Sequence, residues 1–115
     1  MDSAVNLPPL DVPRLLRAYG LTPKKGLGQN FLTDPAALQR VVTAAEIAPG
    51  DAVLEIGPGL GSLTRCLAQA ARRVVAVELD AHILPALREV LAGQENVNIV
   101  QGDMLELDPA ALMNE

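Results

Sequence analysis

The stretch VLEIGPGLG, residues 53–61, joins an apolar run to a glycine-rich turn. The run itself, residues 52–56, is short and bounded by turn residues, as is typical of a parallel strand buried on both faces. Gly57, Gly59 and Gly61 follow at alternate positions, so the backbone can approach a ligand without Cβ atoms in the way. In parallel sheets, nucleotide-like ligands bind where such a loop crosses the carboxyl end of a strand.

The same alternation continues along the chain. Apolar runs at 73–77 and 96–100 predict two more strands, and helical patterns lie between the strands at 62–71 and 81–93. This order predicts an α/β fold, a Rossmann-like doubly wound parallel sheet with right-handed crossovers. The first of these helices is expected to bury Leu63, Cys66, Leu67 and Ala70.

Aspartates mark the starts of the remaining helices. Asp11 is placed to cap a helix over 12–19, Asp34 with Pro35 starts another, and Asp108-Pro109 starts a third. Asp80 is expected to cap the helix at 81–93 in the same way. Residues 1–10 show no periodicity and are interpreted as a flexible lead-in.

Composition excludes several classes of protein. The chain has 115 residues, a net charge of −5, one cysteine and two aromatic residues, Tyr19 and Phe31. A disulfide, a cysteine-based zinc site and an aromatic base-stacking surface are therefore excluded, and we expect no metal. The single cysteine indicates a reducing compartment. No segment approaches the ~20 apolar residues of a membrane span, and a cytoplasmic location is expected. The stretch 12–31, with four bases and no acid, is the candidate nucleic-acid footprint, although such a run is usually a solvated face.

The glycine spacing discriminates between nucleotide ligands. A dinucleotide fingerprint reads G-x-G-x-x-G, whereas this loop reads G-x-G-x-G and is preceded by the acid Glu55. A carboxylate there disfavours a pyrophosphate. It suits a ligand with a cationic end, such as the ammonium or sulfonium of S-adenosylmethionine. A nicotinamide-dependent oxidoreductase is the less favoured alternative.

Two more acids are expected at the same edge of the sheet. Glu78 ends the second run, where a carboxylate can accept hydrogen bonds from both ribose hydroxyls of a nucleoside. Gly102-Asp103 ends the third run, where Asp103 can accept from an adenine amine and the glycine can let the base lie on the backbone. Each also has a plain interpretation, a solvated strand-end acid for Glu78 and a common turn for Gly102-Asp103.

At this point the residues resemble a known family. The segments 55–61, 78 and 102–103 are similar to the cofactor motifs of S-adenosylmethionine-dependent methyltransferases. The run KGLGQNFL, residues 25–32, followed by Asp34, closely resembles the start of the ribosomal RNA adenine dimethyltransferases, and the resemblance extends over about residues 20–113. It implies S-adenosylmethionine as cofactor, small-subunit rRNA in a ribosomal subunit precursor as partner, and dimethylation of two adjacent adenines near its 3′ end. It also implies a seven-stranded sheet in the order 3-2-1-4-5-7-6.

The resemblance also implies a set of cofactor contacts. Asn30 and Leu32 would reach the cofactor from the N-terminal loop, Gly57 would approach its methionine portion, Glu78 would hold the ribose and Asp103 the adenine amine. Glu55, Gly59 and Met104 complete the set of cofactor-binding residues. Residues 1–33 then form an N-terminal extension with a cofactor-covering loop, and residues 34–115 form the cofactor-binding subdomain.

The family's catalytic Asn-Leu-Pro-Tyr motif, expected after a fourth strand, is not among these residues. Asn6-Leu7-Pro8-Pro9 imitates it but offers no ring to stack on a base. We therefore expect an N-terminal fragment that holds the cofactor half of the enzyme, is inactive alone and is monomeric when complete. A methyltransferase for another substrate and a non-catalytic nucleoside-binding module remain the alternatives.

The other conspicuous residues carry weaker hypotheses. Lys24 and Lys25 are either a phosphate clamp or part of a solvated loop, and Phe31 plugs the loop onto the sheet. Cys66 is expected in the core. His82 has no obvious partner, is expected to be exposed and receives no role.

Overall fold

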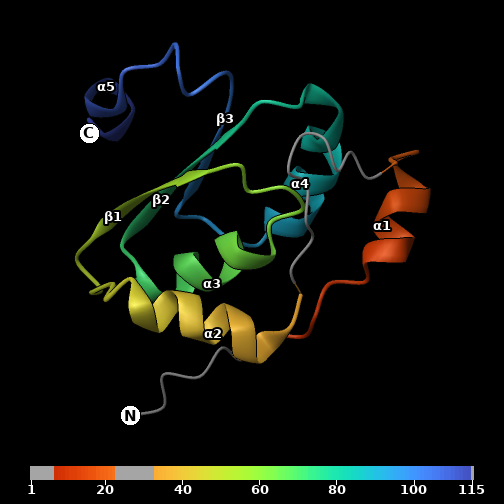
Figure 1. Ribbon diagram of the computed structural model, residues 1–115, viewed down its shortest axis with the longest axis horizontal. Coiled ribbons are helices and arrows are strands. Elements are labelled where there is room, and N and C mark those ends of the chain that lie inside the picture. The colour runs from red at the N-terminus through yellow and green to blue at the C-terminus, as the bar shows by residue number, and fades with distance from the viewer. Residues whose placement is uncertain (1–6, 23–32, 115) are drawn as a thin grey trace.

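The computed structural model describes residues 7–22 and 33–114. Its helices and strands alternate after a helical start (Figure 1). In chain order they are α1 (Val12–Ala18), α2 (Pro35–Ala44), β1 (Ala52–Ile56), α3 (Ser62–Ala70), β2 (Arg73–Glu78), the 3-10 turn η2 (Ala81–Ile83), α4 (Leu84–Leu91), β3 (Val97–Gln101) and α5 (Pro109–Met113).

The three strands form one parallel sheet in the order β1-β2-β3, which confirms the predicted α/β architecture. Ile56 pairs with Val77, and Glu78 pairs with Gln101. The carboxyl ends of all three strands therefore meet at one edge. β2, in the middle, is almost entirely buried, whereas β1 is buried only in part.

Four aspartates cap helices as the sequence predicts. Their carboxylates accept from a backbone N–H two or three residues on, at 3.0–3.1 Å, and the four are Asp11, Asp34, Asp80 and Asp108. The predicted helix at 81–93 begins differently. Residues Ala81–Ile83 form the 3-10 turn η2, and the α-helix starts at Leu84 with Pro85 in its first turn, where a missing N–H costs little.

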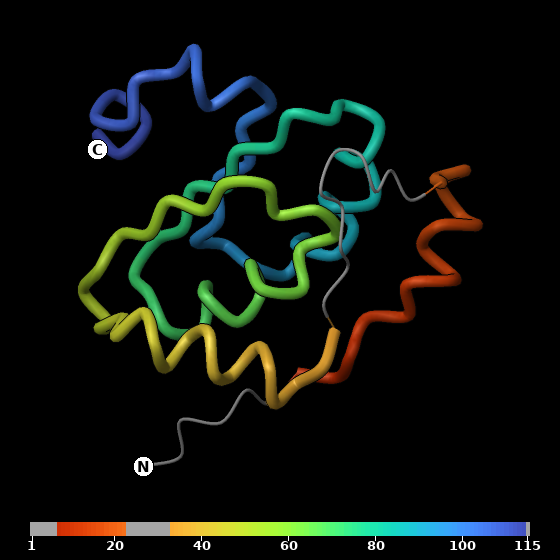
Figure 2. Tube along the Cα trace, viewed as in Figure 1, coloured from red at the N-terminus to blue at the C-terminus, as the bar shows by residue number. Residues whose placement is uncertain are grey.

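The helices cover the sheet through separate buried clusters. Leu67, Ala68, Ala71 and Val74 join α3 to β2. Leu84, Leu87 and Leu91 of α4 pack toward β3. Figure 2 shows α1 beside α4, on the side of the molecule away from β1.

The sequence expectation for the buried face of α3 was wrong in detail. Helix α3 buries Thr64 and Arg65 as well as Cys66 and Leu67, whereas Leu63 and Ala70 of the expected face are only half-buried. The helix is enclosed from more than one side, because the N-terminal segment also packs on it.

Residues 7–10, expected to belong to a flexible lead-in, make defined contacts. The Pro8 carbonyl accepts from Arg65 Nη2 at 2.7 Å, and Leu10 packs against a buried cluster. A buried guanidinium needs hydrogen-bond acceptors, and the Pro8 carbonyl supplies one.

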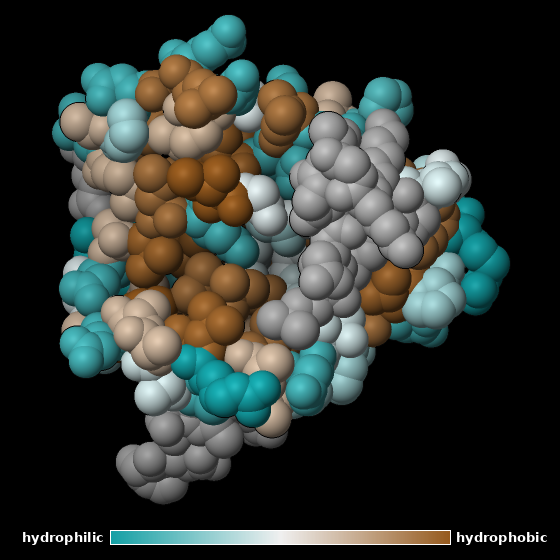
Figure 3. Space-filling model, viewed as in Figure 1, coloured by the Kyte–Doolittle hydropathy of each residue, from teal (hydrophilic) through white to brown (hydrophobic). Residues whose placement is uncertain are grey.

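β1 pairs only with β2 within the described part of the chain. Apolar side chains gather on the surface over β1, between α5 and α2 (Figure 3). Arg73 anchors α5 nearby, since its Nη1 donates to the Met113 carbonyl at 3.3 Å and its Nη2 to the Leu112 carbonyl at 3.5 Å. Because Arg73 pairs with Ala52, this places the end of α5 near the start of β1.

Candidate cofactor site

The glycine-rich loop, residues 57–61, connects β1 to α3. Gly57 N–H donates to the Val77 carbonyl at 2.9 Å and so extends the pairing of β1 with β2. The three glycines have φ values of +73°, +60° and +88°, in the left-handed region that favours glycine. The Gly61 N–H donates to the Pro58 carbonyl at 2.9 Å, and α3 begins immediately after it.

The glycines of this loop serve different purposes. A Cβ on Gly57 would meet nothing within 4 Å, so its backbone faces open space. A Cβ on Gly61 would lie 2.9 Å from Leu87 Cδ1 of α4. Ligand access explains the glycine at position 57, whereas close packing of the loop on α4 explains the one at 61. The sequence interpretation, which gave all three to the ligand, is corrected at Gly61.

Glu78 is directed at this loop from the end of β2. Its Oε1 accepts from Gly59 N–H at 3.1 Å and its Oε2 from Asp80 N–H at 2.9 Å. The side chain is only 6% exposed, so its interpretation as a solvated strand-end acid is wrong. Each carboxylate oxygen has a second lone pair, which leaves the group able to accept from a ligand hydroxyl.

Glu55 lies on β1, two residues before Gly57. Thr64 of α3, fully buried, donates from Oγ1 to Glu55 Oε1 at 2.5 Å. Burial raises the pKa of Glu55 from 4.5 to about 7; the Thr64 hydrogen bond opposes this rise, and the negative charge of Glu78 adds to it.

The two acids share one electrostatic property. Among the described residues, no Arg, Lys or His donates to or pairs with the carboxyl of Glu55 or Glu78. Two mutually repelling carboxyls without a basic partner therefore lie below the loop. Such a site favours a ligand that carries positive charge and disfavours a pyrophosphate.

The end of β3 forms the third part of the sheet edge at which the carboxyl ends of the strands meet. Gly102 N–H donates to the Glu78 carbonyl at 2.9 Å, and Asp103 Oδ1 accepts from Leu105 N–H at 2.9 Å. A Cβ on Gly102 would lie 3.2 Å from Leu107 Cδ1, so a side chain at this position would press on Leu107. Asp103 and Met104 are half-buried beside it.

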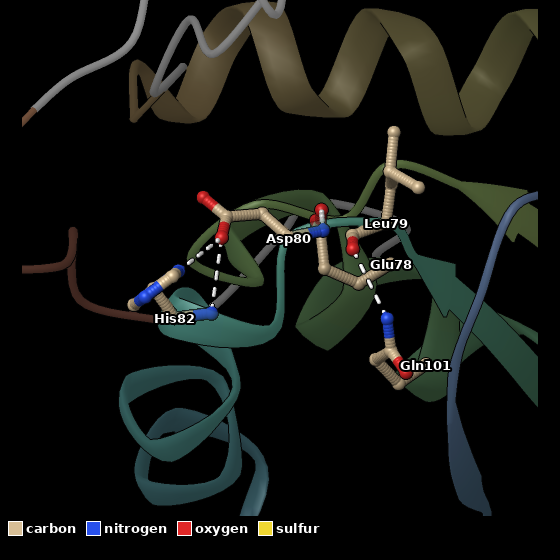
Figure 4. Close-up of polar contacts among 5 residues, drawn as sticks. All are labelled: Glu78, Leu79, Asp80, His82 and Gln101. Carbon is tan, nitrogen blue, oxygen red and sulfur yellow. Dashed lines mark hydrogen bonds and ion pairs between the residues drawn. The ribbon is translucent and has the colours of Figure 1, made fainter.

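Leu79 is a candidate that sequence reasoning missed. It is 56% exposed although it follows the buried Glu78 directly. Its carbonyl accepts from Gln101 Nε2 at 3.2 Å, and Figure 4 shows its side chain directed away from Gln101. A large exposed apolar side chain directly after the Glu78 carboxylate can cover a flat ring. Its sequence signal, a leucine after a strand, is indistinguishable from that of an ordinary core residue.

His82 is exposed as expected but does have a partner. Its Nδ1 lies 3.2 Å from Asp80 Oδ1, the same oxygen that accepts from the His82 N–H (Figure 4). The expectation that no partner lay nearby in sequence was wrong, because a capping carboxylate naturally faces the residue two positions on. Cys66 is buried as predicted, and burial raises the pKa of its thiol.

Several predicted residues lie outside the described part of the chain. They are Asn30 and Leu32, with Lys24, Lys25 and Phe31. Across residues 7–22 and 33–114, no group of three or more His, Cys, Asp or Glu side chains could hold a metal ion. The helices described there are too short or too polar to cross a membrane.

A parallel sheet with an open glycine loop at its edge and an acid at the end of the neighbouring strand is a Rossmann-like arrangement, the one on which class I methyltransferases are built. Solved structures agree. The 23S rRNA methyltransferase ErmE is 44% identical with a TM-score of 0.65, over 70% of this chain and 33% of that one. A dimethyladenosine transferase from Plasmodium falciparum is 30% identical with a TM-score of 0.61, over 67% and 29%.

The family follows from the sequence comparisons. The family model described as ribosomal RNA adenine dimethylase matches residues 20–115, and the chain belongs to this family. Its relatives include proteins named ribosomal RNA small subunit methyltransferase A. That of Deinococcus radiodurans is 51% identical over 111 residues, and that of Moorella thermoacetica is 51% identical over 94. These matches cover 96% and 82% of this chain but only 38% and 33% of the relatives, so the chain spans about a third of their length.

Proposed function

We propose that this chain forms the cofactor-binding part of an S-adenosylmethionine-dependent rRNA adenine dimethyltransferase. In this proposal the complete enzyme methylates two adjacent adenines near the 3′ end of small-subunit rRNA during ribosome biogenesis in the cytoplasm. The observation that carries it is the buried carboxylate of Glu78, held by Gly59 N–H at 3.1 Å beside the open backbone of Gly57. Family membership supports the choice of substrate.

The described residues fit this cofactor. Glu78 has lone pairs left for the ribose hydroxyls, and the Asp103 carboxylate can accept from the adenine amine. Leu79 and Met104 offer apolar surface to the adenine ring. Gly57 leaves room for the methionine portion. The remaining proposed contacts to the cofactor are Asn30, Leu32 and Gly59. In this proposal residues 1–33 form an N-terminal extension with a cofactor-covering loop, and residues 34–115 form the cofactor-binding subdomain.

Charge supports S-adenosylmethionine over a dinucleotide. Burial is the main cause of the raised pKa of Glu55, and the negative charge of Glu78 adds to it. A cationic ammonium or sulfonium relieves the repulsion between the two carboxyls, whereas a pyrophosphate increases it. When bound, S-adenosylmethionine supplies an electrophilic methyl group. The role of these residues is to bind and orient it.

Calorimetry with S-adenosylmethionine and with NAD tests the cofactor. Completed with the remainder of the Deinococcus radiodurans relative, the chain should bind the first and not the second. Glu78→Ala should weaken binding by ~1–3 kcal/mol, since it removes charge-assisted hydrogen bonds. Glu106→Ala, which removes an exposed acid beyond β3, is the matched control and should leave binding unchanged. Binding of NAD without a response to S-adenosylmethionine would end the methyltransferase proposal.

A chimera tests the substrate. The chain replaces the matching segment of the Deinococcus radiodurans relative, and tritium transfer from labelled S-adenosylmethionine to undermethylated ribosomal subunits is measured. Methylation of small-subunit rRNA supports the proposal, and methylation of 23S rRNA instead would favour the activity named for ErmE. A chimera that binds the cofactor but methylates neither RNA would favour the non-catalytic nucleoside-binding module.

A further inference from the structure

The segment of residues 8–21, here called the N-terminal brace, lies almost wholly outside the family match. That match begins at residue 20, so it assigns nothing to helix α1. The brace nevertheless contacts both helices that border the glycine-rich loop. One is α3, which starts where the loop ends, and the other is α4, against which Gly61 packs.

A polar clamp joins the brace to α4. Glu89 Oε2 accepts from Arg14 Nη2 at 2.7 Å, and Glu89 Oε1 accepts from the Tyr19 hydroxyl at 2.6 Å. These contacts lower the pKa of Glu89 and raise that of Tyr19. Arg14 lies in the first turn of α1 and Tyr19 directly follows its last residue, so together the two donors set how the helix lies along α4.

An apolar contact reaches the loop itself. Leu15 of α1 is 1% exposed and shares one buried cluster with Leu60, Ile83 and Ala86. Leu60 is the residue between Gly59 and Gly61, and it is 2% exposed. The side chain that anchors the glycine-rich loop in the core is therefore packed in part by the brace.

At its other end the brace is tied to α3. The carbonyl of Pro8 accepts from Arg65 Nη2 at 2.7 Å, and the Arg65 side chain is 9% exposed. Among the described residues the brace thus spans from α3 to α4 across the cluster that contains Leu60.

We propose that Leu15 is a positioning residue for the cofactor, because it packs the cluster that anchors Leu60 and so holds the loop in its ligand-binding conformation. The proposal rests on the proposed function. A left-handed loop with three positive φ values depends on its surroundings to stay in place. Gly59 N–H can support Glu78, and Gly57 can stay open, only while that conformation persists.

The clamp and the apolar contact contribute differently. Arg14 and Glu89 are about half exposed, and surface pairs of this kind add little stability. Leu15 is buried, so its packing carries most of the attachment of α1. We therefore expect the clamp to orient the brace and Leu15 to support the loop.

The test compares two equivalent truncations. Leu15→Ala removes the support of Leu60, whereas Leu67→Ala removes a similarly buried leucine from the cluster around Val74. Both should lower the urea midpoint. Only Leu15→Ala should raise the Kd for S-adenosylmethionine, by about tenfold, when both are measured under conditions in which they are folded. Equal weakening by both variants, or by neither, overturns the proposal.

Hydrogen exchange gives a readout that needs no ligand. The Gly59 and Gly61 amides, which donate to Glu78 Oε1 and to the Pro58 carbonyl, report on the loop. They should lose protection in Leu15→Ala but not in Leu67→Ala. If the chain bound no S-adenosylmethionine yet showed this pattern, the proposed function would fail while the structural role of Leu15 held.

A milder core variant covers the case in which Leu15→Ala does not fold. Leu15→Val removes less of the side chain that packs on Leu60, and Leu67→Val is its matched control in the other cluster. Leu15→Val should speed exchange at the Gly59 and Gly61 amides, and Leu67→Val should not. Unchanged exchange in Leu15→Val would contradict the support of the loop by the brace.

Discussion

Replacing Glu55 with glutamine should stabilise the protein at pH 8. In the native state burial raises the pKa of Glu55 from 4.5 to about 7. Between these values the unfolded chain has lost the proton and the native state retains it. Linkage then requires stability to fall as pH rises, by about 1.4 kcal/mol per pH unit.

The whole loss amounts to about 3 kcal/mol between pH 4.5 and pH 8, a large share of the stability of a small domain. Gln cannot ionise, and its amide oxygen can still accept from Thr64 Oγ1 as the Glu55 carboxyl does. Glu55→Gln should therefore lack this loss and should exceed the wild type in stability at pH 8, while the two remain similar near pH 5.

Urea unfolding followed by circular dichroism, at pH values from 5 to 8, measures this difference. Glu95→Gln removes an exposed carboxyl in the turn before β3 and is the matched control, which should keep the wild-type profile. The reasoning is refuted if Glu55→Gln retains the wild-type pH dependence, or if it is the less stable protein at pH 8.

Three further outcomes follow from the geometry. Gly61→Ala forces a Cβ to 2.9 Å from Leu87 at a φ of +88° and should cost about 2 kcal/mol or more in urea unfolding, whereas Gly50→Ala, with no atom within 4 Å, should change stability by less than ~1 kcal/mol. Asp34→Ala removes the α2 cap and should lower the free energy of unfolding by about 1 kcal/mol in the same assay, whereas Asp34→Asn keeps a side-chain acceptor and should preserve most of the wild-type stability. The 115-residue chain should self-associate through the apolar edge of β1 in size-exclusion chromatography with light scattering, and a monomer with one sharp thermal transition would contradict this.

The fold could be predicted because its signals are local. The apolar run at 52–56 and the cap at Asp34 depend on residues within a few positions of one another. The order of the strands came from the resemblance, and the sheet confirms the part that this chain supplies. The strand ends at Glu78 and Gln101 lie one residue beyond the predicted runs, because ladder pairing continues past the last apolar residue.

The site could be predicted only as a list of residues. Glu55 and Glu78 are visible in the sequence as acids near strand ends, but their partners are not. Thr64 was indistinguishable from any other residue of its helix, although it is the donor to Glu55. The contact between Pro8 and Arg65 spans 57 positions and has no local signal at all. Which way a side chain points at the edge of a sheet depends on the packing of the elements around it.

The buried acid Glu55 links the stability of the fold to the charge of the candidate site. A carboxyl that is held partly protonated below the loop conflicts with the rule that buried charges are paired, and such conflicts concentrate at functional sites. The conflict is removed when a cation arrives, since positive charge favours the ionised form of Glu55 and offsets its repulsion from Glu78. In the proposed function, the arrangement that lowers stability as the pH rises from 4.5 to about 7 is also the one that favours a positively charged ligand. In that proposal Glu55 contributes through a charge for which the described residues supply no basic partner.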